Sequence, residues 1–209
     1  MLYKTTRSLF KGTYQYKIVL ICSGASSFRS GDMETALKLL SKTSLLQKPD
    51  DVWRINNIKT QDQLDYAIRL ATALKKMKDI EIRVESPWVS VYTNNPDYVT
   101  LLSKLDSSNV KYISEPPKDS PLAANTIIMP KTNYDYRVTL GKTNQDYQAF
   151  VEWAAGRDKL KLTKSCKKEL GKSRSWGGTH FYVTGDNTLL LTKMHLGGVI
   201  TKIERIVKA

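Results

Sequence analysis

Residues 60–85 read TQDQLDYAIRLATALKKMKDIEIRVE and contain the two patterns that decide the fold class. From Leu64 onward, apolar side chains recur at the three- and four-residue spacing of a helix that buries one face. Thr60 and Gln63 form a capping-box pattern at its start. From Ile80 onward, apolar residues alternate with charged ones, which is typical of a half-buried strand. A helix followed directly by an alternating strand predicts a mixed α and β fold.

Towards the N-terminus, the pattern predicts a hairpin and then a helix. Leu2–Phe10 and Tyr16–Cys22 read as strands, and Lys11-Gly12 is a plausible turn between them. A helix is predicted to run from Asp32, which can cap it, to about Lys42.

Towards the C-terminus, strands predominate. We predict a strand at Tyr134–Leu140, helices at Asn144–Ala155 and Thr163–Leu170, and three final strands at Thr179–Thr184, Leu189–His195 and Val199–Val207. Glycine-rich turns between the last three predict an antiparallel meander. The predicted fold is therefore α+β, with mixed or antiparallel sheets, about five helices and a terminal three-stranded meander. No internal repeat is apparent.

The chain of 209 residues suits a single α+β domain that spans residues 1–209. A subdivision near residues 114–126 is the alternative, because this stretch contains three of the seven prolines. It would separate an N-terminal subdomain, residues 1–113, from a basic C-terminal subdomain, residues 127–209.

The positive charge is concentrated at the two ends of the chain. The net charge is +13, from 33 basic and 20 acidic residues. Residues 157–209 contribute 12 basic and 4 acidic residues, and residues 1–24 contribute four lysines or arginines and no acid. Solubility alone does not require this asymmetry, which favours a polyanionic partner; a solvated basic face without a partner is the alternative. Nucleic acid is the partner that it favours, because a phosphate backbone neutralises clustered cations and releases its condensed counterions.

One surface built from both ends is predicted to contact the nucleic acid. Trp176 lies in the small-residue stretch Lys172–Gly178, where its ring could stack on a base. The predicted contact residues are Arg157, Lys159, Lys161, Lys164, Lys167, Lys168, Lys172, Arg174 and Trp176 at the C-terminal end, and Lys4, Arg7 and Lys11 at the N-terminal end.

The main hypothesis is thus a non-catalytic, nucleic-acid-binding accessory protein of a replication, transcription or packaging complex. Two alternatives stay open. One is a structural or assembly protein, such as a virion component, whose basic ends dock on an acidic protein partner. The other is a phosphodiester-cleaving enzyme that uses His180 and His195, the only histidines, as its acid and base.

Other chemistries find little support in the sequence. Cys22 and Cys166 are too few for a disulfide framework or a cysteine-based metal site, which favours a reducing, cytoplasmic setting. No cofactor, metal or membrane partner is expected, since the longest apolar run, Ile18–Cys22, is far shorter than a membrane span.

Overall fold

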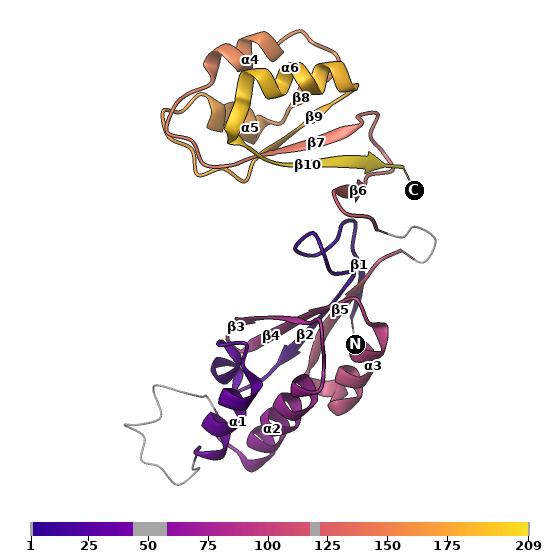
Figure 1. Ribbon diagram of the computed structural model, residues 1–209, viewed down its shortest axis with the longest axis vertical. Helices are drawn as coiled ribbons and strands as arrows, with labels where there is room; N and C mark the ends of the chain where they lie inside the picture. Colours follow the sequence, from indigo (N-terminus) through magenta and orange to yellow (C-terminus); the bar gives the residue numbers. More distant parts are fainter. Residues whose placement is uncertain (1, 44–57, 118–121, 209) are drawn as a thin grey trace. The chain divides into compact units, whose positions relative to one another are not determined.

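The computed structural model describes residues 2–43, 58–117 and 122–208. The chain forms two compact units, Met1–Pro121 (unit 1) and Leu122–Ala209 (unit 2), so the division falls within the proline-rich stretch. The described residues form six α-helices and two five-stranded sheets, one sheet in each unit (Figure 1). The mixed α and β content predicted from the sequence is therefore confirmed.

The sheet of unit 1 has the spatial order β1-β5-β2-β4-β3. β1 runs parallel to β5, and all other neighbours are antiparallel. Its strands are β1 (Tyr3–Thr5), β2 (Tyr16–Ile21), β3 (Glu81–Glu85), β4 (Trp88–Thr93) and β5 (Val110–Glu115). Its helices are η1 (Ala25–Phe28), α1 (Met33–Ser41), α2 (Gln61–Lys75), α3 (Pro96–Leu105) and η3 (Ser107–Asn109), where η denotes a 3-10 helix.

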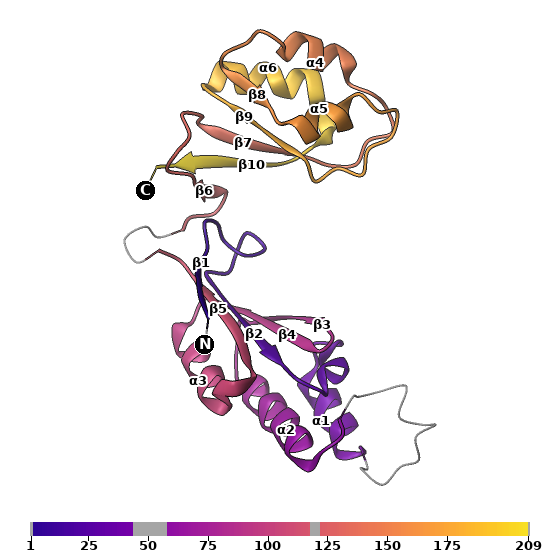
Figure 2. The ribbon, with the colours of Figure 1, turned by 180° about the vertical axis from the view of Figure 1, so that it is seen from behind.

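Helices α1, α2 and α3 all cover one face of this sheet (Figure 2). Side chains alternate along β2, so Ile18 and Leu20 enter the core that the sheet shares with α2, whereas Lys17 points to the other face. We call this other face the helix-free face. The predicted caps form: the Asp32 carboxylate accepts hydrogen bonds from two backbone amides of α1, and the Thr60 hydroxyl accepts one from the first turn of α2.

The sheet of unit 2 has the spatial order β6-β10-β7-β9-β8. Its helices again pack on one face, around a core that contains Phe150 and Phe181 (Figure 1). Its strands are β6 (Thr126–Ile128), β7 (Tyr136–Leu140), β8 (Leu160–Leu162), β9 (His180–Val183) and β10 (Ile200–Val207). Its helices are α4 (Gln148–Ala154), α5 (Lys164–Leu170), α6 (Asp186–Leu196) and η4 (Gly197–Val199).

The predicted C-terminal meander is not found. The segment Leu189–His195, predicted as its middle strand, lies in α6, and β7 separates β9 from β10 in the sheet. Leu189, Thr192 and Leu196 are buried at helical spacing, whereas Leu191 is exposed. A run of three leucines fits a strand or a helix equally well, and here packing of one stripe against the core selects the helix.

The predicted N-terminal hairpin is also not formed as a pair of neighbouring strands. β1 pairs in parallel with β5, where Tyr3 lies opposite Ile113, and it is not adjacent to β2. Only an isolated bridge between Phe10 and Tyr14 spans the Lys11-Gly12 turn. The turn at Lys11-Gly12 is therefore present, but the strand before it pairs with β5, about a hundred residues later in the chain.

The two units repeat one topology. In each, the first strand lies parallel to the last, and the remaining four strands have the order of a ferredoxin-like βαββαβ fold. All neighbours except the first and last strand are antiparallel in both sheets. The helices differ: unit 1 has α1 and α2 between β2 and β3, where unit 2 has α4 alone between β7 and β8, and unit 2 has α5 between β8 and β9.

The pairing register repeats as well. Lys17 lies opposite Tyr92, and in unit 2 Arg137 lies opposite Tyr182. Both sheets have an irregularity in the last strand at the corresponding place, next to Leu20 in unit 1 and next to Leu140 in unit 2. The sequences around the central strands correspond too, since residues 14–20 read YQYKIVL and residues 134–140 read YDYRVTL.

Candidate nucleic-acid interface

The structure divides the predicted contact residues between the two units. Nine of them, eight basic residues and Trp176, belong to unit 2, and all nine are exposed. Lys4, Arg7 and Lys11 belong to unit 1 and are exposed as well. Unit 2 has 15 basic and 7 acidic residues, so it carries +8 of the total charge of +13. The densest part of the predicted surface therefore lies on one unit.

Trp176 projects from a loop that is held rigidly at its base. Its side chain is 68% exposed, although the neighbouring Ser175 is buried. The Ser175 backbone exchanges hydrogen bonds of 2.9 and 3.1 Å with Thr143, and its hydroxyl donates to Glu169 at 2.8 Å. Because these bonds fix Ser175 in place, the adjacent indole is presented to solvent by an ordered backbone.

Gly177 allows this loop to lie directly against the end of β7. Its φ is +76°, a left-handed conformation that favours glycine. A Cβ atom at this position would lie 2.4 Å from the carbonyl carbon of Gly141. The glycine is therefore required both by the turn and by the close approach of the two backbones.

Two cations lie beside the exposed indole. The guanidinium of Arg174 is 4.9 Å from the Trp176 ring centroid, and the ammonium of Lys142 is 5.1 Å from it. An indole with cations over its ring offers a nucleotide a stacking partner for the base and positive charge for the phosphate. The sequence did not indicate Lys142, because it is 34 positions before Trp176 and only the fold brings the two together.

Glu169 neutralises part of this loop. Its carboxylate forms an ion pair with Lys172 and accepts the Ser175 hydroxyl, and the hydrogen bond from Lys172, followed by the one from Ser175, lowers the Glu169 pKa. Lys172 is thus a structural partner within the loop, and the charges that remain for a ligand there are Arg174 and Lys142.

A second group of predicted residues lies at the β8 edge. Arg157, Lys161 and Lys167 line a pocket of about 350 Å³ together with Tyr134. The Arg157 guanidinium lies 4.4 Å from the centroid of the Trp153 ring and donates a 3.0 Å hydrogen bond to the Trp153 carbonyl. The pocket lining therefore combines three basic residues, one of them held in place, with one acid, Asp158, and one aromatic ring, that of Tyr134.

Helix α5 connects the pocket to the Trp176 loop along the chain and carries exposed Lys164, Lys167 and Lys168. The Thr163 hydroxyl caps the helix by accepting the backbone amide of Cys166, and it donates to the His180 carbonyl at 2.8 Å. The buried face of α5 consists of Cys166 and Leu170, so its lysines point away from the core.

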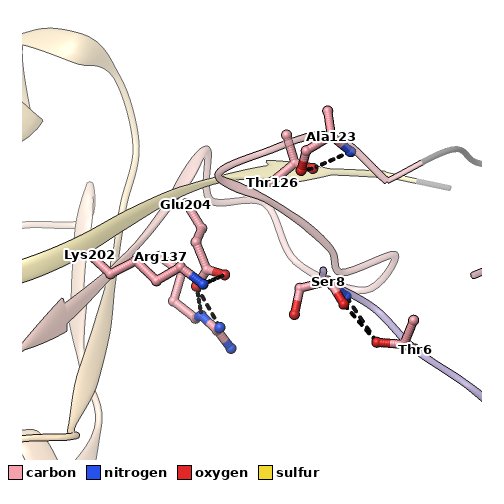
Figure 3. A network of polar contacts seen from close by, with 7 residues as sticks. All are labelled: Thr6, Ser8, Ala123, Thr126, Arg137, Lys202 and Glu204. Atoms are coloured by element: carbon pink, nitrogen blue, oxygen red, sulfur yellow. Dashed lines mark hydrogen bonds and ion pairs between the residues drawn. The ribbon is translucent and has the colours of Figure 1, made fainter. Parts of the chain in front are cut away.

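The sheet of unit 2 also has a face that its helices leave uncovered, opposite to the core residues Val138 and Phe181, and the sequence did not indicate the polar residues on it. Arg137 on β7 pairs with Glu204 on β10, whose carboxylate also contacts Lys202 at 2.8 Å (Figure 3). Tyr182 lies opposite Arg137 and stacks on Tyr134, with ring centroids 5.7 Å apart. Alternation along β7 and β9 is the signal that could have placed Arg137 and Tyr182 on one face.

The two histidines are not brought together. His180 is on β9, next to Tyr182, on the face away from the helices, since its neighbour Phe181 enters the core. His195 is in α6, and its ring lies 4.3 Å from that of Trp153 on the helix-covered side. The shared sheet face that the paired-histidine hypothesis requires is therefore not observed.

Cys22 and Cys166 are both buried, and burial raises the pKa of each thiol to about 11. Such thiols are poor nucleophiles at neutral pH. Within residues 2–43, 58–117 and 122–208, no group of three or more acidic, histidine or cysteine side chains is arranged to hold a metal ion.

Comparisons with protein-family models, curated proteins and solved structures give no match to this chain. The functional conclusions below therefore rest on the residues and their geometry. Among the helices that the structure describes, none is long and apolar enough to cross a membrane.

Proposed function

We propose that this protein binds nucleic acid through a basic surface on unit 2, as a non-catalytic accessory component of a replication, transcription or packaging complex. The observation that carries the proposal is Trp176, a 68% exposed indole on an anchored loop with Arg174 and Lys142 beside it. An exposed indole on an anchored loop offers a π face for a base, and the cations at its ring can pair with the adjoining phosphates.

The charges around this loop support a polyanion as that ligand. The exposed lysines of α5 and the cations of the β8 edge continue along the chain up to the loop. Like charges at this density repel one another, and phosphates relieve the repulsion while releasing counterions. Stacking on the indole adds a contribution that every base can make. Binding is expected to depend strongly on salt and only weakly on sequence.

The test is fluorescence-anisotropy binding of the full chain to short DNA and RNA, single- and double-stranded, over a series of salt concentrations. We expect log affinity to fall linearly with log salt, by about 0.9 units per neutralised phosphate on duplex DNA. Replacing Lys164, Lys167 and Lys168 by glutamate should weaken binding sharply and leave the circular dichroism spectrum unchanged.

The matched control replaces three exposed lysines of unit 1, Lys59, Lys78 and Lys104, by glutamate, which changes the net charge by the same amount. If both triple variants lose affinity equally, net charge alone is responsible and the unit 2 surface is not the site. If the wild-type protein binds none of the four nucleic acids at low salt, the proposed function is wrong.

An assembly or structural role is the second candidate, and helix α6 favours it. Leu190, Leu191 and Met194 are 58%, 45% and 74% exposed, although they are apolar. A contiguous apolar strip of this kind suits contact with another protein. A defined oligomer in multi-angle light scattering, together with absence of nucleic-acid binding, would favour this role over the first.

A further inference from the structure

The helix-free face of the unit 1 sheet carries two accessible aromatic rings. Trp88 on β4 is 37% exposed, and Tyr112 on β5 is half-buried. Trp88 belongs to the side of β4 that faces away from the helices, because its neighbour Val89 is in the core. Tyr112 lies opposite Val19, on the same face of β2 as Lys17.

Three lysines surround these rings. The ammonium of Lys111 is 3.0 Å from the Trp88 ring centroid, and that of Lys4 is 4.3 Å from the Tyr112 centroid. Lys17 lies 5.4 Å from both Tyr112 and Tyr92. The irregular pairing of β5 with β2 leaves Lys111 without a direct partner on β2, which brings it to the same side as Tyr112.

These lysines contact rings rather than acids. Among the ion pairs formed between described residues, none includes Lys4, Lys17 or Lys111. Burial lowers the pKa of Lys17, but hydrogen bonding to Tyr112 and the contact with Tyr92 outweigh it and hold the pKa above its usual value. The Lys17 ammonium is thus charged at neutral pH, and none of the three lysines is paired with an acid in the ion pairs of the described residues.

The acids of this face are already neutralised. Glu81 forms an ion pair with Lys11, and Glu85 forms one with Arg83 at 2.5 Å. The lysines around Trp88 and Tyr112 therefore give the face a net positive charge. This pairing also shows that Lys11, which was predicted to contact nucleic acid, has a structural partner.

Each unit has an exposed tryptophan near the start of the same strand of its sheet, although the two positions are not equivalent in the pairing register. Trp88 begins β4, and Trp176 lies four residues before β9, which is the corresponding strand of unit 2. Each indole has at least one cation over its ring, Lys111 in unit 1 and Arg174 in unit 2. A tryptophan with a cation over its ring thus occurs near the start of the corresponding strand in both units, within β4 in unit 1 and in the loop before β9 in unit 2.

We infer that the helix-free face of unit 1, around Trp88 and Tyr112, is a second nucleic-acid site and that its ligand is single-stranded. The inference rests on the proposed function, which it extends from unit 2 to unit 1. The accessible rings of Trp88 and Tyr112 can stack only on unstacked bases, which a duplex does not offer without opening. As a base stacks on a ring, the lysine over that ring moves to the adjoining phosphate.

The test compares the full chain and its variants in binding a labelled oligothymidylate of about 15 nucleotides and a duplex of equal length. One variant carries Lys4→Glu and Lys111→Glu. A second carries Trp88→Leu, which keeps an apolar side chain and removes the ring. We expect each to bind the single strand roughly 5- to 100-fold more weakly and the duplex with a smaller change.

The matched control carries Lys59→Glu and Lys78→Glu, just before and just after α2, and changes the net charge as much as the first variant. It should bind the single strand with an affinity within about twofold of the wild-type value, because these two lysines flank a helix that covers the other face of the sheet. Thermal unfolding of every variant checks that unit 1 is folded.

The outcomes separate the inference from the proposed function. Single-strand binding that is unchanged in both unit 1 variants overturns the inference, and the unit 2 proposal stands if the α5 triple variant still loses binding. If the unit 1 variants lose single-strand binding and the α5 triple variant does not, the inference is supported and the unit 2 surface is not a nucleic-acid site. No binding by the wild-type protein overturns both.

Discussion

Arg137 and Glu204 lie directly opposite each other on β7 and β10, and the guanidinium binds a carboxylate of which only 1% is exposed. Both the Nε and a terminal nitrogen of Arg137 donate to the same oxygen, Oε2, while Lys202 contacts Oε1 (Figure 3). A buried acid is stable in its charged form only with such partners. Glu204 therefore ties two cations to the central part of the unit 2 sheet.

Replacing Glu204 by glutamine should lower the free energy of unfolding by about 1–3 kcal/mol. The loss is expected because Arg137 and Lys202 keep their charges and lose the buried carboxylate that pairs with them. Urea unfolding measures it. Glu85→Gln is the control, since the Glu85 side chain is 51% exposed in its pair with Arg83 and should cost about 1 kcal/mol or less.

The same carboxylate predicts a pH dependence. Burial raises the Glu204 pKa, but hydrogen bonds from Lys202 and Arg137 outweigh it, so the folded-state pKa lies below the usual 4.5. A lowered pKa contributes stability that is present above pH 4.5 and is lost as the pH falls through the folded-state value. The stability difference between the wild type and Glu204→Gln should thus shrink on acidification below pH 4.5. A constant difference down to pH 3 would contradict the role given to the pair.

Gly177→Ala should damage the Trp176 loop more than Gly178→Ala. Both glycines have a left-handed φ, +76° and +80°, so both substitutions carry the strain of about 1 kcal/mol. Only at position 177 does the new Cβ meet backbone, at 2.4 Å from Gly141, whereas at 178 nothing lies within 4 Å. Gly177→Ala should therefore have the lower free energy of unfolding in chemical denaturation and the weaker affinity for nucleic acid. Equal effects of the two substitutions would show that the loop is not held against β7.

The two thiols should resist modification in the folded protein. Cys22 and Cys166 are buried, and their pKa values of about 11 leave little thiolate at pH 8. Ellman's reagent should therefore label the native protein slowly and the urea-unfolded protein rapidly. Fast labelling of either cysteine under native conditions would mean that its part of the core opens readily.

Substitutions in α6 can distinguish the helix from the strand that the sequence suggested. Leu189→Ala should cost about 2 kcal/mol or more, because this side chain is 8% exposed. Leu191→Gln should change stability by about 0.5 kcal/mol or less, since Leu191 is 45% exposed. In a strand, both residues would face the same side and both substitutions would be costly. Thermal unfolding of the two variants decides between these cases.

Local features of the fold could be predicted from the sequence. The caps at Asp32 and Thr60 form, and Thr163, where the basic helix was predicted to begin, caps α5. These features depend on neighbouring residues, whose spacing is visible in the chain. The strands at Tyr136–Leu140 and Ile200–Val207 were found for the same reason.

Long-range pairing could not be predicted in this way. Nothing near β1 indicates that its partner is β5, and nothing near Leu189 indicates that its helix covers a sheet. The repeat of the two units could not be recognised from the sequence, because the similar sequence at residues 14–20 and 134–140 is only seven residues long. The repeated pairing register, by contrast, extends through both sheets. Of the candidate site, the basic residues could be listed, but Lys142 and Lys111 join their tryptophans only in the fold.

The parallel pairing of first and last strands has a consequence for synthesis on the ribosome. Tyr3 pairs with Ile113, and Ile127 pairs with Ile206, so each unit is completed by its own final strand. Until that strand emerges, β2 and β7 each keep one open edge, and closing so long a loop is slow. The β3–β4 hairpin, by contrast, needs only local contacts. We therefore expect unit 1 to fold only after residue 115 leaves the exit tunnel, with nascent chains shorter than this most prone to aggregation.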